Sequence, residues 1–415
     1  MRFPAKFLLK ILILLVAFVA GNWVCMSWWY RNVNYGEAKL DTPDFSLRTR
    51  GGYIQKAFAR RFTIRITGPE MHLDVRNLTS KTQSIYLKWE NIPPAAKTIA
   101  TNLRLTDGAR FSRCEIGPGQ VGGIDIAAKQ EQEFTFAVIS DMHGNLKSTR
   151  EILRHISARK PAFIIGLGDF VRSPGRQNLE TFRHFYHANT KLPLYAVPGE
   201  CDLDKDKSVL HFVESFGPHF AAWTIDRTLF VFIDNSARTL DPTQIGWLET
   251  EIKRFDPYVD SILFFAHHPF VNIPEVNYGF SGKNTHAMAQ SLFKNPKCRA
   301  VFSGHVHLSK TVTENNVTHY ISGGGGGKLE YPGNFHYLIV AVTRKNVQVT
   351  HHEIPQKKAP WYAAIQFWAY AYWAYLHQEI LLVILNLLGI GLWILFFFII
   401  KLRRRKVVVI AADKI

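Results

Sequence analysis

The residues of this chain best suited to chemistry are acidic and histidine side chains that recur in short blocks along one half of the sequence. Seven of them can bind a metal ion: Asp141, His143, Asp169, Glu200, His267, His305 and His307. Carboxylate oxygens and imidazole nitrogens are ligands of divalent manganese, iron and zinc. Seven ligands are too many for one four-coordinate ion but suit two ions that share a bridging carboxylate. Because paired metal ions can cleave phosphate esters, that chemistry is the first hypothesis.

The blocks lie at the ends of apolar runs. From residue 134 onward, runs of strand length occur at 134–140, 162–167, 194–197, 229–233, 261–266 and 300–303. Helical patterns occur at 146–159, 178–188, 208–216, 243–255 and 285–294, and later strands are expected at 318–322 and 335–354. This alternation predicts an α/β layered domain over 134–354. Because open α/β sheets place their sites at the carboxyl ends of strands, the blocks should meet at one edge.

Residues 45–133 follow another pattern, in which short runs of alternating apolar and polar residues are separated by turns such as Gly68-Pro69 and Pro93-Pro94. The pattern predicts a small antiparallel β-sandwich. No catalytic constellation is visible there, so we interpret it as a spacer or a binding module. The preceding polar residues 32–44 are expected to form a linker.

Two uncharged apolar stretches, 11–30 and 380–400, are long enough to cross a bilayer, which takes about 20 residues. Aromatic residues of the kind found at membrane interfaces end the first, and basic residues follow the second. Because basic residues stay on the cytoplasmic side, 1–31 would be a cytoplasmic stub with an anchor and 401–415 a cytoplasmic tail. The region between the spans would then lie outside the inner or plasma membrane of the cell.

Alternatives for these stretches stay open. The first could be a cleaved signal peptide, and the second a buried core helix. The aromatic segment 355–379 is expected to be helical at 361–377. This helix would either lie in the membrane interface, extend the second span or pack on the domain.

The net charge of +17 is partly concentrated beside the two apolar stretches. That distribution favours membrane lipids as partners and disfavours nucleic acid. Outside the cytoplasm, Cys114, Cys201 and Cys298 would meet an oxidising compartment where pairing is possible, whereas Cys25 lies inside the first span.

The order of the blocks resembles the calcineurin-like metallophosphoesterase superfamily, whose pattern is Asp-x-His, Gly-Asp, Gly-Asn-His-Asp/Glu, His and Gly-His-x-His. Residues 134–354 reproduce four of these five blocks. The resemblance implies a four-layer αββα domain that binds two divalent ions. It assigns to one ion the ligands Asp141, His143 and His307. It assigns to the other ion Glu200, His267 and His305, with Asp169 bridging both.

The third block departs from the family pattern, because Glu200 and Cys201 stand where the family has Asn and His, although Asp202 is retained. Glutamate can bind a metal as well as asparagine can, but it adds a negative charge. Three carboxylates and a bridging hydroxide would then balance two divalent ions. We therefore expect a preference for a monoanionic diester or a pyrophosphate over a dianionic monoester.

Cys201 leaves three interpretations open, since a thiol cannot replace an imidazolium that donates a proton near neutral pH. It could be an additional soft ligand that favours zinc. It could be inert, with His268 supplying the proton. The protein could also have lost catalysis. Of the remaining candidates, Asp202 would orient its neighbours, and His268 could instead be an ordinary polar residue at a strand end.

Residues 322–328 consist of a serine, five glycines and a lysine. They lack the spacing of a phosphate-binding P-loop. We expect the glycines to bring the backbone close to the metal ions.

The sequence thus predicts a membrane-anchored enzyme that hydrolyses a phosphodiester or a diphosphate through a metal-bound hydroxide. Two anchors would hold the site near the bilayer, which favours a lipid-linked substrate over a soluble nucleotide or a glycerophosphodiester. A catalytically silent metal-binding receptor or scaffold of the cell envelope is the alternative from another class. A nuclease is disfavoured, because no basic groove with interleaved aromatic residues is visible.

Overall fold

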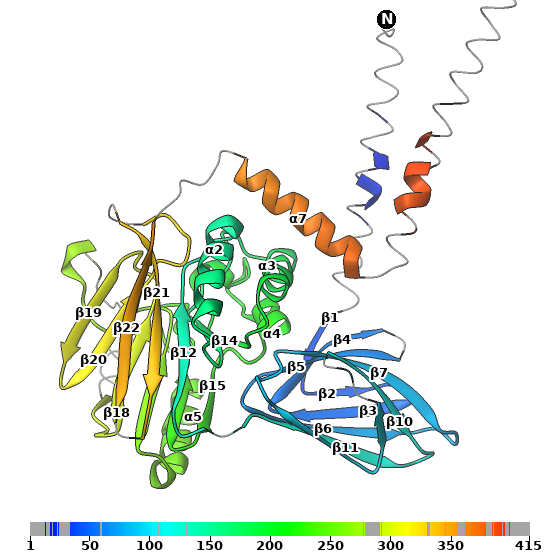
Figure 1. Cartoon of the computed structure of the whole chain (residues 1–415), viewed down its shortest axis with the longest axis horizontal. Coiled ribbons are helices and arrows are strands. Elements are labelled where there is room, and N and C mark those ends of the chain that lie inside the picture. The colour runs from blue at the N-terminus through cyan, green and yellow to red at the C-terminus, as the bar shows by residue number, and fades with distance from the viewer. Residues whose placement is uncertain are drawn as a thin grey trace, which may run out of the picture. The chain divides into compact units, whose positions relative to one another are not determined.

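In the computed structural model, the described residues are 34–355, except 59, 107, 109, 130, 277, 279–290, 292, 330–332 and 345, together with 362–378 and isolated positions within 13–24 and 384–398. The chain divides into two compact units, 1–363 and 364–415. Within the first unit, the strands before residue 128 form one pair of sheets and the later strands form another (Figure 1).

The N-terminal pair of sheets is a β-sandwich. One sheet contains, in spatial order, β1 (Asn34–Glu37), β4 (Gly52–Phe58), β5 (Arg61–Ile66), β7 (Gln83–Glu90), β10 (Phe111–Ile116) and β9 (Arg104–Thr106). The other contains β2 (Lys39–Asp41), β3 (Phe45–Arg50), β6 (Glu70–Asn77), β11 (Val121–Ala127) and β8 (Lys97–Thr101). Alternate residues of both sheets point inward and form one apolar core.

Two expectations for this region are wrong. Residues 32–44, expected to be a linker, supply β1 and β2. Both are edge strands, and an edge strand shows little apolar alternation because only part of it packs against the core. The sandwich is also not wholly antiparallel, since β5 and β7 pair in parallel. The chain passes from β5 to β7 through β6 in the opposite sheet, and that crossover reverses its direction twice.

The C-terminal pair of sheets builds the α/β part. The β12 sheet has the order β14 (Leu194–Ala196), β13 (Ile164–Gly166), β12 (Phe134–Ile139), β21 (Phe335–Val342) and β22 (Val347–Ile354). The β17 sheet has the order β15 (Ala221–Ile225), β16 (Thr228–Phe232), β17 (Ser261–Phe265), β18 (Cys298–Ser303), β20 (Val317–Ser322) and β19 (Ser309–Glu314). The expected single strand at 335–354 is in fact the antiparallel pair β21 and β22.

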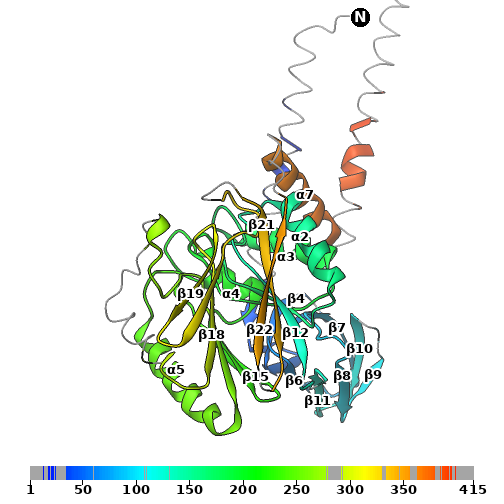
Figure 2. The same cartoon turned by 60° about the vertical axis from the view of Figure 1, so that its left-hand side comes forward.

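Apolar packing joins these sheets into layers. Phe136 of the β12 sheet packs edge-to-face on Phe230 and Phe265 of the β17 sheet. The helices α2 (Leu146–Ala158), α3 (Arg176–Asn189) and α4 (Leu210–Phe216) form one helical layer, and α2 packs beside β21. Helix α5 (Pro242–Phe255) buries Leu248 and Ile252 against the β17 sheet. Figure 2 shows this mixed α/β arrangement from a second direction.

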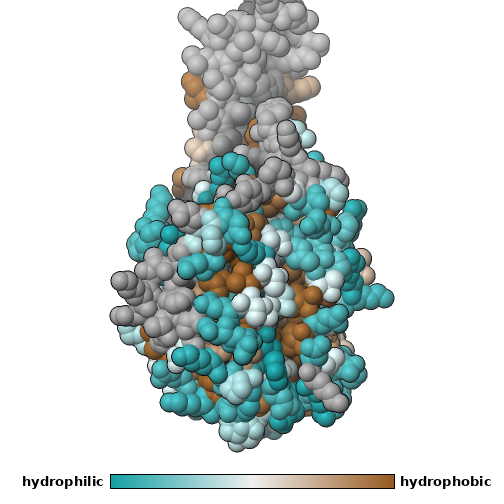
Figure 3. Space-filling view, turned by 90° about the vertical axis from the view of Figure 1, so that its left-hand side faces the viewer, coloured by the Kyte–Doolittle hydropathy of each residue, from teal (hydrophilic) through white to brown (hydrophobic). Residues whose placement is uncertain are grey.

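The helices expected at 146–159, 178–188, 208–216 and 243–255 are all present, within a few residues of their predicted ends. Most of the helix expected at 285–294 lies outside the described residues. The face of the molecule seen in Figure 3 is mainly hydrophilic, with small apolar areas between the polar side chains.

The register of the parallel strands brings their carboxyl ends to one level. Ile139, Gly166 and Ala196 are aligned across β12, β13 and β14. Phe265 of β17 pairs with Phe302 of β18 in the facing sheet. The loops that follow these five strands therefore begin side by side.

The sandwich is docked on β14, the edge strand whose following loop carries Glu200. The side chain of Asn91 donates to the carbonyl oxygen of Leu194 (3.0 Å) and accepts from its backbone N–H (2.6 Å). Arg65, which is fully buried, donates to the same carbonyl oxygen (2.7 Å). These bonds satisfy an edge that would otherwise expose unpaired backbone groups.

A buried charge cluster reinforces this docking. Arg183 of α3 forms ion pairs with Glu180 (2.6 Å) and with Glu90 of the sandwich, and Lys56 pairs with Glu180 (3.1 Å). Burial opposes the ionisation of both carboxyls, but the positive charge of Arg183 outweighs it and holds the pKa of Glu90 and Glu180 well below the usual value.

In the second unit, α7 (Ala363–Gln378) occupies the segment expected to be helical at 361–377. Trp368 and Trp373 are about half exposed on it, and the Tyr372 hydroxyl donates to Asn386 Oδ1 (2.8 Å). Among the described residues, no helix is both long and apolar enough to cross a bilayer. Most of the predicted spans 11–30 and 380–400 lies outside those residues.

The buried cluster predicts a large stability effect. Arg183→Ala should lower the free energy of unfolding by about 3–5 kcal/mol, because it removes the fully buried cation that Glu90 and Glu180 share. Arg254→Ala is the matched control. It breaks an exposed pair with Glu251 on α5 and should cost about 0–1 kcal/mol. Denaturant unfolding of the full-length variants measures both, and equal losses would contradict the prediction.

Candidate metal centre

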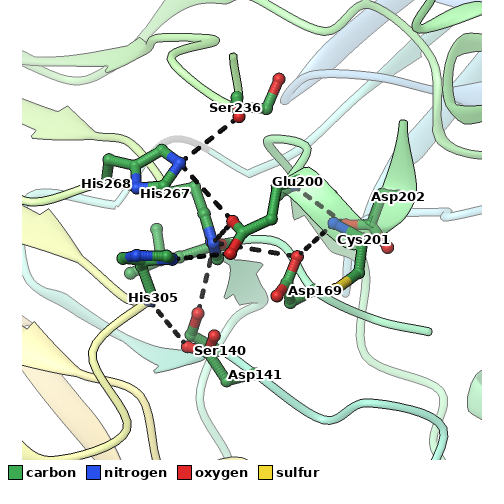
Figure 4. Close-up of polar contacts among 12 residues, drawn as sticks. Ser140, Asp141, Asp169, Glu200, Cys201, Asp202, Ser236, His267, His268 and His305 are labelled. Carbon is green, nitrogen blue, oxygen red and sulfur yellow. Dashed lines mark hydrogen bonds and ion pairs between the residues drawn. The ribbon is translucent and has the colours of Figure 1, made fainter. Parts of the chain in front are cut away.

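The seven predicted ligand residues come together at the carboxyl edge of the parallel strands. The loops after β12, β13 and β14 carry Asp141, His143, Asp169 and Glu200, and those after β17 and β18 carry His267, His305 and His307. Figure 4 shows side chains from both sheets facing a common centre. The ligand atoms form several overlapping groups, and within each group they lie within 4.8 Å of one another.

The first group surrounds Asp141. His143 Nε2 lies 3.0 Å from His307 Nε2, and His307 Nε2 lies 3.4 Å from Asp141 Oδ1. Asp169 Oδ2 is 3.4 Å from His143 Nε2, which places that carboxylate beside the group. Asp141, His143 and His307 are the residues that the family resemblance assigns to one ion, and their ligand atoms lie together here.

The second group surrounds Glu200. Its Oε2 lies 2.6 Å from His267 Nε2, and its Oε1 lies 2.9 Å from His305 Nδ1. His267 Nε2 is also 3.8 Å from Asp169 Oδ1. The two carboxylate oxygens of Asp169 thus face different groups, which is the geometry of a bridging ligand.

Buried atoms without hydrogen bonds indicate that this centre fits metal ions. Within the part of the chain that the structure describes, Asp141 Oδ1, Glu200 Oε2, His267 Nε2 and His305 Nδ1 are buried and make no hydrogen bond of acceptable geometry. A buried polar atom without a partner costs about 1–3 kcal/mol. Four such atoms converging on one place are explained by cations that they would coordinate.

The histidine rings are oriented by bonds through their other nitrogen. His267 Nδ1 lies 2.6 Å from the carbonyl oxygen of Leu167, and His307 Nδ1 contacts that of Lys328. A ring that donates Nδ1–H to a carbonyl leaves the lone pair of Nε2 free, as ligation requires. In both histidines the free Nε2 points into the centre.

The backbone is strained at several of these positions. Asp141, His143, Asp169 and His305 have φ values of 60°, 46°, 53° and 64°, in the left-handed region that residues other than glycine seldom adopt. Such outliers cost about 1–3 kcal/mol each and concentrate at functional sites. Four of the seven ligand residues share this conformation, which also occurs at other turns of the described chain, so it supports the assignment only together with the convergence of the ligand atoms.

Protonated histidines offset the negative charge of the carboxylates in this centre. Burial disfavours charged imidazoles, but Asp169 and Glu200 raise the pKa of His267 well above its usual value, and Asp141 raises that of His307 to about 9. Burial likewise disfavours ionised Asp141, yet His307 and His267 lower its pKa to about 2. Metal binding must therefore displace protons from the histidines.

The three residues predicted to assist catalysis have different surroundings. Asp202 in the short helix η1 (Glu200–Asp202) is buried and accepts from the backbone N–H groups of Phe170 (3.0 Å) and Gly199 (3.0 Å). Asp202 therefore ties the backbone at Gly199, just before Glu200, to the backbone at Phe170, just after Asp169. His268 Nε2 lies 3.5 Å from Glu200 Oε2. Burial and the neighbouring His267 lower the pKa of His268 to about 2, so its imidazole is neutral.

Cys201 lies beside both groups. Its backbone N–H donates to Asp169 Oδ1 (2.9 Å), and its sulfur forms a ligand group with His143 and Asp169. Burial and the charge of Asp169 raise the pKa of the thiol above its usual range. Cys114, Cys201 and Cys298 are all free thiols.

The glycine run closes over the first group. The backbone N–H of Gly327 donates to the carbonyl oxygen of Asp141 (2.8 Å). A Cβ at Gly327 would lie 2.7 Å from His143 Cδ2, so no larger residue fits without displacing a ligand. The structure therefore confirms the close backbone approach expected from the sequence.

Sequence reasoning missed Asn235, which holds the His267-His268 pair. Asn235 Oδ1 accepts from the backbone N–H of His267 (3.1 Å) and His268 (2.9 Å), and its Nδ2 donates to the carbonyl oxygen of His268 (2.8 Å). The signal was available, because Asn235 follows the apolar run 229–233 just as the ligand blocks follow theirs.

Comparison with known proteins identifies the class. Residues 134–309 match the family model described as Calcineurin-like phosphoesterase. Over 139 residues the chain is 25% identical to a curated protein of Fibrobacter succinogenes named a probable cyclic nucleotide phosphodiesterase, in a match that covers 32% of this chain and 53% of that protein. The chain thus spans about half the length of that relative.

Similar solved structures include a purple acid phosphatase from yellow lupin (Lupinus luteus) seeds, with 12% identity, a TM-score of 0.45 and coverage of 69% of this chain and 70% of that one. A dimetal phosphatase from Danio rerio has 12% identity, a TM-score of 0.40 and coverage of 55% and 99%.

Residues 134–309 are therefore a calcineurin-like phosphoesterase domain, as the order of the blocks predicts. The class of this domain is that of the metal-dependent phosphoric ester hydrolases.

Metal binding can be tested on the bridging carboxylate. We expect the full-length protein to bind two divalent ions and Asp169→Asn to lose at least one of them, because each oxygen of Asp169 faces a different group. Metal at 100 times its dissociation constant should stabilise the wild type by about 2.7 kcal/mol, and metal affinity should rise with pH up to about 9 as His307 loses its proton.

Elemental analysis and thermal unfolding measure these effects. Asp204→Asn is the control, since Asp204 pairs with His211 (2.5 Å) outside both groups. Equal metal content in the Asp169→Asn variant and the wild type would contradict the assignment.

Proposed function

We propose that this protein is a membrane-anchored phosphodiesterase with a centre of two divalent ions. The observation that carries the proposal is the convergence of seven ligand residues, four of them with buried atoms that make no hydrogen bond, inside a calcineurin-like phosphoesterase domain. When bound, two divalent ions would supply Lewis acidity and a nucleophile at neutral pH.

The seven ligand residues would form two sets, one for each ion. Asp141, His143 and His307 would hold one ion, and the second ligand set is Glu200, His267 and His305. Asp169 would join the two sets, because its oxygens face both. Behind the ligands, Asp202 fixes the Glu200 loop and Asn235 fixes the His267-His268 pair. These hydrogen bonds would hold the ligand loops in position before a substrate binds.

The charge of the centre favours a diester. Asp141, Asp169 and Glu200 would nearly balance two divalent ions, so a dianionic monoester gains little attraction compared with a monoanionic diester. The Fibrobacter succinogenes relative is named a probable cyclic nucleotide phosphodiesterase, and a cyclic nucleotide is a monoanionic diester. That name supports the diester over the diphosphate.

A cavity beside His307 offers room for the organic part of such a substrate. Its volume is about 520 Å³, and the lining includes the charged residues Glu275, Lys310 and Glu353. The lining also includes Leu308 and Leu329 and is therefore mixed, and its charged side chains suit a sugar or a lipid headgroup. A lipid-linked substrate would therefore present its headgroup to the centre.

The membrane location is inferred from the apolar stretches 11–30 and 380–400 and from the basic residues at both ends of the chain. Two such anchors would hold the centre near the bilayer and raise the local concentration of a lipid-linked phosphodiester. Membrane lipids would then be the principal partners.

The second candidate function is a silent metal-binding receptor or scaffold. Cys201 favours it, because the thiol stands where the family has a proton-donating histidine and is itself hard to ionise. His268 does not supply a charged proton donor in its place, since its imidazole stays neutral. A neutral imidazole can still donate a hydrogen bond to a leaving oxygen.

The test is hydrolysis by the metal-loaded full-length protein. We expect turnover of bis-p-nitrophenyl phosphate with manganese, iron or zinc, and a loss of about 10²-fold or more in Asp169→Asn. A cyclic nucleotide and a glycerophosphodiester serve as natural diesters. Stoichiometric metal without turnover of any of them would favour the silent receptor instead.

The charge argument has its own test. Glu200→Asn removes one negative charge and should raise the ratio of monoester to diester hydrolysis by about tenfold, which corresponds to about 1.4 kcal/mol. The ratio is measured with p-nitrophenyl phosphate and bis-p-nitrophenyl phosphate at equal metal occupancy. An unchanged ratio would remove the electrostatic basis for the diester.

A further inference from the structure

A loop outside the ligand blocks places an arginine at the edge of the centre. The loop follows β16, and Asn235 ties it to the His267-His268 pair. Its start is fixed because Asp234 Oδ2 lies 2.6 Å from His219 Nδ1 and the Asp234 backbone N–H donates to Gln244 (2.8 Å). Its end is fixed because the backbone N–H of Arg238 donates to the carbonyl oxygen of Asn235 (2.8 Å).

The backbone of Arg238 is itself strained. Its φ is 61°, in the left-handed region that is rare for a long side chain and costs about 1–3 kcal/mol. The same conformation occurs at four of the ligand residues. Eight other described residues besides glycine also adopt it, so the place of Arg238 beside the centre, and not its φ, sets it apart.

The guanidinium of Arg238 is exposed and approaches a ligand histidine. Its Nη2 lies 3.5 Å from His305 Nε2. Among the residues that the structure describes, no carboxylate lies within ion-pair distance of it. An arginine beside a cluster of acidic ligands, yet paired with none of them, keeps its donors available for another anion.

Metal binding would make those donors more available. His305 directs Nδ1 toward Glu200 (2.9 Å) and Nε2 toward Arg238. If Nδ1 ligates an ion, the ring proton resides on Nε2, which then cannot accept a hydrogen bond from the guanidinium. Arg238 is left at the edge of the centre, beside the His305 ring, with donors for which the described residues supply no acceptor.

We propose that Arg238 is a substrate-binding residue that donates to a non-bridging oxygen of the phosphate group held at the Glu200 side of the centre. This proposal rests on the proposed function, because it assigns a contact to the substrate of that same site. A guanidinium matches two phosphate oxygens with parallel N–H groups, which a lysine cannot do.

The test compares Arg238→Ala, Arg238→Lys and a matched control, Arg227→Ala, in the metal-loaded full-length protein. Arg227 precedes β16, at the end of the strand opposite to Arg238, and pairs with Asp260 (2.8 Å). The readouts are bound metal by elemental analysis, the dissociation constant of inorganic phosphate by calorimetry, and KM and kcat for bis-p-nitrophenyl phosphate.

We expect Arg238→Ala to weaken phosphate binding and to raise KM by about 10–100-fold, which is the range of one charge-assisted hydrogen bond. The metal content should not change. Arg238→Lys should recover part of the loss, and Arg227→Ala should match the wild type. Unchanged phosphate affinity and KM in Arg238→Ala would overturn the proposal, and so would a loss of metal, which would make Arg238 a support for His305.

The two hypotheses fail separately. If the wild type binds metal and phosphate but hydrolyses no ester, the proposed function fails while phosphate affinity still decides the role of Arg238. If the wild type is active and Arg238→Ala retains its phosphate affinity and KM, only the role of Arg238 fails.

Discussion

Three carboxylates buried or half-buried at one edge of two sheets are the constraint on which the rest of this structure depends. Asp141, Asp169 and Glu200 cannot remain ionised there without positive charge nearby. Protonated His267 and His307 supply it in the structure described here. Divalent cations would supply it more completely, because they also satisfy the buried atoms that lack hydrogen bonds.

The supporting structure explains how those charges are held together. Parallel strands of both sheets end at one level, so five loops begin beside one another. The sandwich fixes the strand before Glu200 through Asn91 and Arg65. Behind the ligands, Asp202 and Asn235 bind backbone N–H groups, and the glycine run admits a close approach that any side chain would block. The strain at the ligand positions is tolerated because packing and hydrogen bonds determine them from several sides.

Much of this could be predicted from the sequence, because its signals are local. Apolar runs such as 134–140 and 261–266 mark buried strands, and the ligands follow those runs directly. Edge strands were harder to predict: β2 and β19 are largely polar, and most of their side chains are exposed. The hairpin within 335–354 was missed because apolar residues continue on both sides of its turn.

Other features depend on contacts that no local pattern encodes. The docking of the sandwich joins Asn91 to Leu194, more than a hundred residues apart. The role of Asn235 depends on the alignment of β16 with β17. Asp202, expected to orient its neighbours, does so through the backbone of Phe170 and Gly199. Arg238 carried no motif, and only its distance from His305 distinguishes it.

Anomalous X-ray scattering from crystals of the manganese-loaded protein would test the two-ion centre most directly. We predict two anomalous peaks about 3.5–4 Å apart, one among Asp141, His143 and His307 and the other among Glu200, His267 and His305, with Asp169 between them. A single peak, or ions bound away from these side chains, would contradict the assignment.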